Sequence, residues 1–124
     1  MKKRTALFFA FACFTLISCR HHGNTSITLR ESDHYFSMKA YFSENRTRDV
    51  EEYMDDKIGE RSNMSFVNTR IDGELSLDDR TQFYMKKSPG HVEIKLYKNE
   101  NSSQSYQRIK SMCEGIKEVI ANKP

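Results

Sequence analysis

The sequence predicts a single α+β domain in which a five-stranded, largely antiparallel sheet carries two helices on one face. Five segments between residues 27 and 97 alternate apolar with polar residues at a spacing of two, which is typical of strands with one buried face. Two other segments repeat apolar residues at spacings of three and four, which is typical of amphipathic helices. The resulting order is β-β-α-β-β-β-α, and no internal repeat or second domain is indicated.

The first two predicted strands form a hairpin. Apolar residues alternate with polar ones at Ile27 and Leu29, and again from Phe36 to Phe42. We expect a two-residue turn at Ser32-Asp33, because this turn sets Leu29 opposite Phe36 and pairs apolar residues across the two strands.

The first predicted helix begins at the capping residues Asn45-Arg46-Thr47 and ends at Gly59. Its apolar stripe consists of Val50, Tyr53, Met54 and Ile58. Four acidic residues fall on its other faces, and we interpret them as a solvated surface rather than a cation site. They are Glu51, Glu52, Asp55 and Asp56.

A meander of three strands follows. Alternation from Phe66 to Leu77 predicts one long strand, and Asp78-Asp79-Arg80 is the turn that ends it. A second turn at residues 88–91, with Pro and Gly at its centre, sets Met85 opposite Ile94. Opposite charges also face each other across this turn, so we expect this register to be well determined.

The last helix follows a polar break at residues 99–103, which also supplies its cap. Its apolar stripe is long and regular. Because Cys113 lies within that stripe, we interpret it as a small buried hydrophobic residue rather than a reactive thiol. The stripe is Tyr106, Ile109, Met112, Cys113, Ile116, Val119 and Ile120.

The N-terminus has the pattern of an export signal. A basic start at residues 2–4 precedes an uncharged apolar run from Ala6 to Ile17, which is shorter than the about 20 residues needed to span a bilayer. The run ends in Leu16-Ile17-Ser18-Cys19, which resembles the lipobox of bacterial lipoproteins. The resemblance implies cleavage before Cys19 and attachment of lipid to that cysteine. The alternative is an ordinary secreted protein that is cleaved near a cysteine.

This resemblance divides the chain into three segments: a signal peptide at 1–18, a lipidated cysteine and tether at 19–26, and the domain at 27–124. It implies a protein of the bacterial cell envelope that is held at a membrane by the lipid on Cys19. No acidic run follows Cys19, which favours the periplasmic side. The membrane is therefore one expected partner.

Cleavage would change the charge and cysteine content. The formal net charge of +3 comes from 20 basic and 17 acidic residues, and losing Lys2, Lys3 and Arg4 would leave 17 of each. We therefore expect no nucleic-acid partner. Cys13 would leave with the signal and Cys19 would carry lipid, so Cys113 would have no partner for a disulfide within the domain.

We expect no catalysis, no cofactor and no metal site. The sequence has no Gly-x-Ser-x-Gly motif, no glycine-rich phosphate loop and no His-Glu-x-x-His motif. His21 and His22 are adjacent in the tether, a spacing that does not preorganise a metal site. The remote alternative is a carboxylate-dependent hydrolase, which would need a pocket that gathers Asp72, Glu74 and a histidine.

The sheet face opposite the helices is the predicted binding surface, because tyrosines and basic residues alternate on it. Such a surface suits an envelope protein, a peptide, a glycan or an anionic ligand, although Tyr and Lys also make ordinary exposed cross-strand pairs. We therefore expect a small membrane-anchored lipoprotein that acts as a non-catalytic binding or interaction module. The residues are Tyr35, Tyr41, Tyr84, Tyr97, Lys39, Arg70, Lys86 and Lys95.

A second function remains open from the sequence. Small envelope lipoproteins also include periplasmic inhibitors and immunity-type proteins that block an enzyme. Such a protein needs a projecting loop that fills an active site, and Asp78-Asp79-Arg80 is the corresponding loop in this chain.

Overall fold

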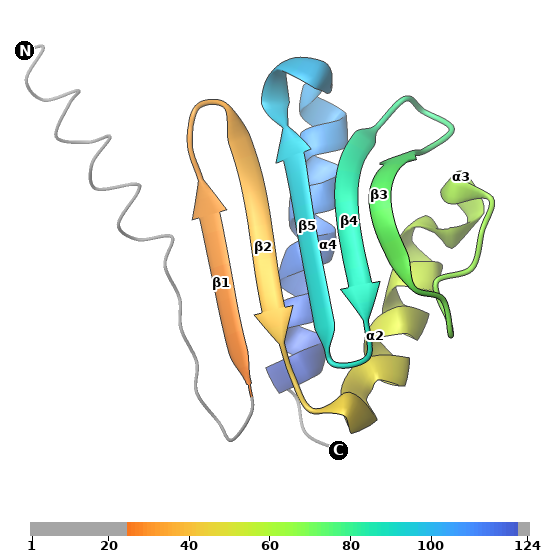
Figure 1. The fold of residues 1–124 in the computed structure, drawn as a ribbon. Helices are drawn as coiled ribbons and strands as arrows, with labels where there is room; N and C mark the ends of the chain where they lie inside the picture. Colours follow the sequence, from red (N-terminus) through yellow and green to blue (C-terminus); the bar gives the residue numbers. More distant parts are fainter. Residues whose placement is uncertain (1–24, 122–124) are drawn as a thin grey trace, which may run out of the picture.

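The computed structural model describes residues 25–121, which form a five-stranded antiparallel sheet with the main helices on one face (Figure 1). The predicted α+β class, strand count and layer arrangement are confirmed. The spatial order is β1-β2-β5-β4-β3, so the central pair joins strands that are far apart in the chain. The strands are β1 (Ser26–Glu31), β2 (Tyr35–Tyr41), β3 (Ile71–Ser76), β4 (Gln82–Ser88) and β5 (His91–Tyr97). The lipobox-like residues 16–19 lie outside the described residues.

The first helical segment is longer than predicted. It continues through Gly59, which has helical backbone angles, and ends at Asn63, whose φ of 60° is left-handed. Asn63 therefore terminates the helix, as glycine or asparagine does at many helix ends. The segment consists of η1 (Glu44–Arg46), α2 (Thr47–Met54), the π-helical η2 (Asp55–Gly59) and α3 (Glu60–Ser62). The second helix is α4 (Ser103–Ala121), preceded by η3 (Lys98–Glu100).

The register of the first hairpin differs from the prediction by two residues. Leu29 pairs with Met38 rather than with Phe36, and the turn is centred on Asp33 and His34. The Ser32 hydroxyl causes this shift, because it accepts the backbone N–H groups of His34 at 3.0 Å and Tyr35 at 3.3 Å. A shift of two preserves side-chain parity, so each residue keeps its predicted sheet face.

The predicted long strand from Phe66 is wrong in its first half, because β3 begins at Ile71. Residues 66–70 form a loop whose backbone bonds to helix side chains instead of a neighbouring strand. The N–H of Phe66 donates to Asp55 Oδ1 at 2.6 Å, and the N–H of Asn68 donates to Glu51 Oε1 at 3.0 Å. The remainder of the meander is confirmed, including the pairing of Met85 with Ile94.

The core lies between the sheet and the helices. The apolar stripe of α4 contributes Ile109, Met112, Cys113 and Ile116, and the side chain of Cys113 is fully buried as predicted. The sheet contributes the odd-numbered apolar residues of β1 and β4 and the even-numbered residues of β2 and β5. The opposite face of the sheet is therefore left to polar and aromatic side chains.

Candidate functional site

The second face of the sheet, here called the open face, is not covered by any helix of residues 25–121 (Figure 1). Antiparallel pairing arranges its side chains in rows across the strands. One row runs Arg30, Ser37, Lys95, Tyr84 and Glu74, and the next runs Thr28, Lys39, Glu93, Lys86 and Asp72.

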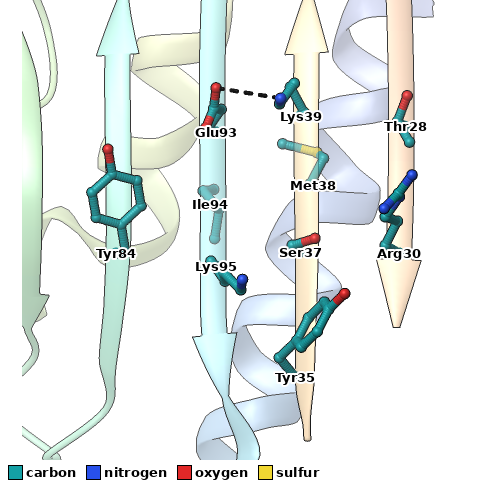
Figure 2. A pocket seen from close by; sticks show the side chains of 10 residues that line it. All are labelled: Thr28, Arg30, Tyr35, Ser37, Met38, Lys39, Tyr84, Glu93, Ile94 and Lys95. Atoms are coloured by element: carbon teal, nitrogen blue, oxygen red, sulfur yellow. Dashed lines mark ion pairs between the residues drawn. The ribbon is translucent and has the colours of Figure 1, made fainter. Parts of the chain in front are cut away.

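A hollow of about 460 Å³ lies in the middle of the open face. Figure 2 shows the short Ser37 next to Tyr35 on β2, with Lys95 of β5 lying between Ser37 and Tyr84 of β4. The volume of the hollow is within the range of small-ligand sites. The hollow is lined by Thr28, Arg30, Tyr35, Ser37, Met38, Lys39, Tyr84, Glu93, Ile94 and Lys95.

The hollow carries an excess of positive charge. Three cationic side chains line it, whereas Glu93 is its single carboxylate. Glu93 Oε2 lies 3.2 Å from His91 Nε2 and 3.9 Å from Lys39 Nζ. The other two cations, Arg30 and Lys95, have no ion-pair partner among residues 25–121.

Aromatic contacts fix one of these cations in place. The ammonium of Lys95 lies 4.4 Å from the ring centre of Tyr35 and 5.3 Å from that of Tyr97. The two tyrosine rings meet edge to face, with their centres 6.4 Å apart. Cation–π attraction therefore positions Lys95 without neutralising its charge.

Tyr84 separates the hollow from an acidic edge of the sheet. Its hydroxyl donates to Asp72 Oδ1 at 2.7 Å, and this hydrogen bond raises the pKa of Tyr84 above its usual value of 10.0. Asp72 and Glu74 both project from β3, beyond β4 as seen from the hollow. The open face is therefore polarised: Arg30 on β1 and Lys95 on β5 have no ion-pair partner among residues 25–121, and the carboxylates of Asp72 and Glu74 lie on β3.

The structure distributes the eight predicted face residues over several places. Four of them line the hollow. Tyr97 does not line it, but its ring contacts the ring of Tyr35, which does. Tyr41 lies at the other end of the face and stacks on His91, with ring centres 4.5 Å apart. Arg70 precedes β3 and lines a different cavity. The four residues in the hollow are Tyr35, Lys39, Tyr84 and Lys95, and Lys86 lies on the face outside it.

The sequence interpretation missed four polar residues of the hollow. The alternation that places Ile27 and Leu29 in the core also places Thr28 and Arg30 on the open face, so the signal for these two was present. Their juxtaposition with Lys95 required the β2–β5 pairing, which connects distant segments. The missed residues are Thr28, Arg30, Ser37 and Glu93.

A second cavity, of about 520 Å³, lies beside the start of α2. Two arginines line it, but Arg48 Nε is bound to Glu52 Oε2 at 2.9 Å. Neither cavity is lined by Asp72 and Glu74 together with a histidine, which is what the hydrolase alternative needs. Across residues 25–121, no group of three or more His, Cys, Asp or Glu residues is arranged to hold a metal ion.

The turn Asp78-Asp79-Arg80 is tied to the domain by its own carboxylates. Asp79 Oδ1 accepts the hydroxyl of Thr81 at 2.7 Å, a bond that lowers the pKa of Asp79, and Asp79 Oδ2 lies 2.6 Å from Arg108. Asp78 Oδ1 lies 3.1 Å from Arg61 Nη1. The turn therefore presents the exposed side chains of Asp78 and Arg80 to any partner.

Within the described part of the chain, no helix is both long and apolar enough to cross a membrane. Comparisons of the chain with protein-family models, with curated proteins and with solved structures found no match. A function for this α+β domain therefore has to be inferred from its own residues and their geometry.

Proposed function

We propose that this chain is a small lipoprotein of the bacterial cell envelope that acts as a non-catalytic binding module, with the open face as its binding surface. The observation that carries the proposal is the hollow in that face. It is lined by Arg30 and Lys95, two cations that have no ion-pair partner within residues 25–121, and by the rings of Tyr35 and Tyr84. A rigid antiparallel sheet holds these groups in fixed register. Preorganised polar and aromatic groups of this kind are typical of recognition sites.

Binding accounts for the hollow better than hydrolysis does. Hydrolysis by paired carboxylates needs two acidic groups that face the same substrate bond. Glu93 is the single carboxylate lining the hollow, and Asp72 is engaged by the hydroxyl of Tyr84. The cations and hydroxyl groups can instead hold a ligand by hydrogen bonds and charge.

The anchor part of the proposal depends on Leu16-Ile17-Ser18-Cys19. Residues 20–25 separate Cys19 from the start of β1, and six extended residues reach about 20 Å. A lipid on Cys19 would therefore keep the start of β1 within about this distance of the membrane surface. Mass spectrometry of the mature N-terminal peptide tests this part: we expect a peptide that begins at an acylated Cys19, whereas an unmodified N-terminus would contradict it.

Photo-crosslinking in intact cells tests the binding surface. A photoreactive phenylalanine analogue is placed at Tyr35 or Tyr84 on the open face, and at the exposed Gln107 or Glu114 of α4 as controls. We expect ligand or partner adducts from the open-face positions and none from α4. Adducts confined to α4, or equal at all four positions, would contradict the proposal.

Photo-crosslinking also distinguishes binding at the open face from the alternative function, inhibition of an enzyme. A photoreactive residue at Arg80 reports on the β3–β4 turn, which would have to enter the active site of a target enzyme. Adducts from Arg80 to an enzyme, without adducts from Tyr35 or Tyr84, would favour inhibition over binding at the open face.

A further inference from the structure

The cations of the hollow are concentrated on one side. Arg30 lies on the edge strand β1 and Lys95 on the central strand β5, with Ser37 of β2 between them in the same row. Figure 2 shows this row continuing across the sheet to Tyr84. The carboxylates of Asp72 and Glu74 lie further still, on β3, so a ligand with one anionic end would be oriented along the row.

The hollow also offers hydroxyl groups and a carboxylate for hydrogen bonding. Thr28 and Ser37 contribute hydroxyl groups, and Glu93 contributes a carboxylate that can accept from ligand hydroxyls. The Tyr84 hydroxyl is held by Asp72, which keeps its ring in one position on the open face. Four strands separated by about 4.8 Å give the row a length of about 14 Å, longer than a single sugar ring.

The chemistry of the lining favours a saccharide over a peptide. Bound peptides usually pair with a sheet edge or insert apolar side chains into pockets. The hollow lies over β2 and β5, whose backbone groups are engaged in the sheet, and its two aliphatic lining residues, Met38 and Ile94, are each 1% exposed. Hydroxyl, carboxylate, cationic and aromatic groups together complement a hydroxylated ring that bears an acidic group.

From this charge complementarity, we propose that the hollow binds an acidic saccharide, with its carboxylate between Arg30 and Lys95 and a sugar ring against Tyr84. The inference rests on the proposed function of the open face and assigns the chemical class of its ligand. The Ser37 hydroxyl lies between the two cations in the row and donates to the same carboxylate. The affinity falls with rising salt, because two of the contacts are charged and near the surface.

Titration of the purified protein with trigalacturonic acid tests the proposal, with the methyl ester of the same trisaccharide as the matched neutral ligand. Calorimetry measures the affinity, and amide chemical shifts show which residues are affected. We expect the acid to bind at least about tenfold more tightly than the ester, and shifts to centre on Ser37 and Lys95. Arg30→Gln should weaken binding of the acid about tenfold, whereas Lys117→Gln on α4 removes one charge and leaves the affinity unchanged.

Three outcomes would overturn the acidic-saccharide proposal. Equal affinity for the acid and its methyl ester would show that the site binds a saccharide without recognising the charge of its carboxylate. Shifts on the open face with phosphatidylglycerol vesicles, but with neither saccharide, would identify a membrane surface as the ligand. If no probe shifts the amide signals of the open face, the proposed ligand class is wrong. Photo-crosslinked adducts from Tyr35 and Tyr84 in cells would still support the open face as a binding surface.

Discussion

Lys87 Nζ lies 2.7 Å from Glu51 Oε2, and their side chains are only 1% and 6% exposed. Lys87 also donates to the carbonyl of Thr69, and the second oxygen of Glu51 accepts the N–H of Asn68 at 3.0 Å. The ion pair therefore fastens the loop at residues 66–70 to the domain. This arrangement corrects the interpretation of Glu51 as part of a solvated acidic surface, and Asp55 is likewise engaged by the backbone of Phe66.

Removing one member of this pair should destabilise the protein strongly. Glu51→Gln or Lys87→Met leaves a buried group without its charged partner, and the expected loss in the free energy of unfolding is about 3–5 kcal/mol. The double variant Glu51→Leu/Lys87→Met should be more stable than either single variant, because no buried charge remains. Urea unfolding measures both effects.

The exposed pair of Arg48 and Glu52 provides the control. Its side chains are 62% and 58% exposed, so Arg48→Gln should change the free energy of unfolding by no more than about 0.5 kcal/mol. If Glu51→Gln has an effect as small as that of Arg48→Gln, the buried ion pair does not hold the loop.

Glu31 should make stability depend on acid pH. Burial alone would raise its pKa, but hydrogen bonds from Lys98 and Tyr106 and the charge of Lys110 lower the pKa below its ordinary value of 4.5. A lowered pKa in the folded state stabilises the protein above pH 4.5, and this contribution is lost as the pH falls through the folded-state pKa.

The measurement is the free energy of unfolding between pH 7 and pH 3. Glu31→Gln should be less stable than the wild type at neutral pH and should lose less stability on acidification. Glu60→Gln, which removes an exposed carboxylate that forms no ion pair in the described residues, should follow the wild-type profile. Parallel profiles for Glu31→Gln and the wild type would disprove the role of Glu31.

Gly115 of α4 permits close packing against Tyr53 of α2. A Cβ atom at Gly115 would lie 1.7 Å from the Tyr53 hydroxyl oxygen and 2.3 Å from its Cζ. Gly115→Ala should therefore destabilise the protein by about 1–3 kcal/mol, although alanine is normally the better helix residue. In a Tyr53→Ala background the same change should be stabilising, and thermal unfolding of the four proteins measures the reversal. An unchanged sign would contradict the packing explanation.

Gly90 is required by the β4–β5 turn. Its φ is 74°, and a Cβ atom there would lie 2.8 Å from the carbonyl oxygen of Phe42. Gly90→Ala should lower the free energy of unfolding by about 1–3 kcal/mol through backbone strain and this contact. Gly73→Ala is the matched control, because no atom lies within 4 Å of its added Cβ, and this variant should retain or slightly increase stability.

Cys113 should be unreactive in the folded protein. Its side chain is fully buried, and desolvation raises the pKa of its thiol well above the usual range, so the reactive thiolate is suppressed. Peptide-resolved mass spectrometry after treatment with iodoacetamide should show modification of Cys113 only in urea. Rapid modification under native conditions would show that α4 opens locally.

Much of the fold was predictable from local sequence patterns. Alternation at period two placed Ile27, Leu29, Phe83 and Met85 on the buried face, and the stripe of α4 placed Cys113 in the core. The turn at Asp78-Asp79-Arg80 retained its predicted register because its length and the parity of the flanking residues agreed. These features depend on the periodicity of the backbone, which each segment carries by itself.

The elements that differ from the sequence prediction are those in which a side chain forms hydrogen bonds with the backbone. The Ser32 hydroxyl moved the hairpin turn, and the carboxylates of Glu51 and Asp55 turned a predicted strand into a loop. The same alternation that buried Met85 also pointed Lys87 inwards, but nothing in the sequence showed which acidic residue it meets.

The sequence by itself determined the α+β class, the inward and outward faces of the strands, and the N-terminal pattern that resembles a lipobox. Only the tertiary structure decided that Arg30 and Lys95 face the same hollow, and that Glu51 is buried against Lys87. The physical reason is the difference between local and long-range pairing. The spacing of apolar residues is a property of one segment of the sequence. A binding site or a buried ion pair instead depends on which distant segments become neighbours in the fold.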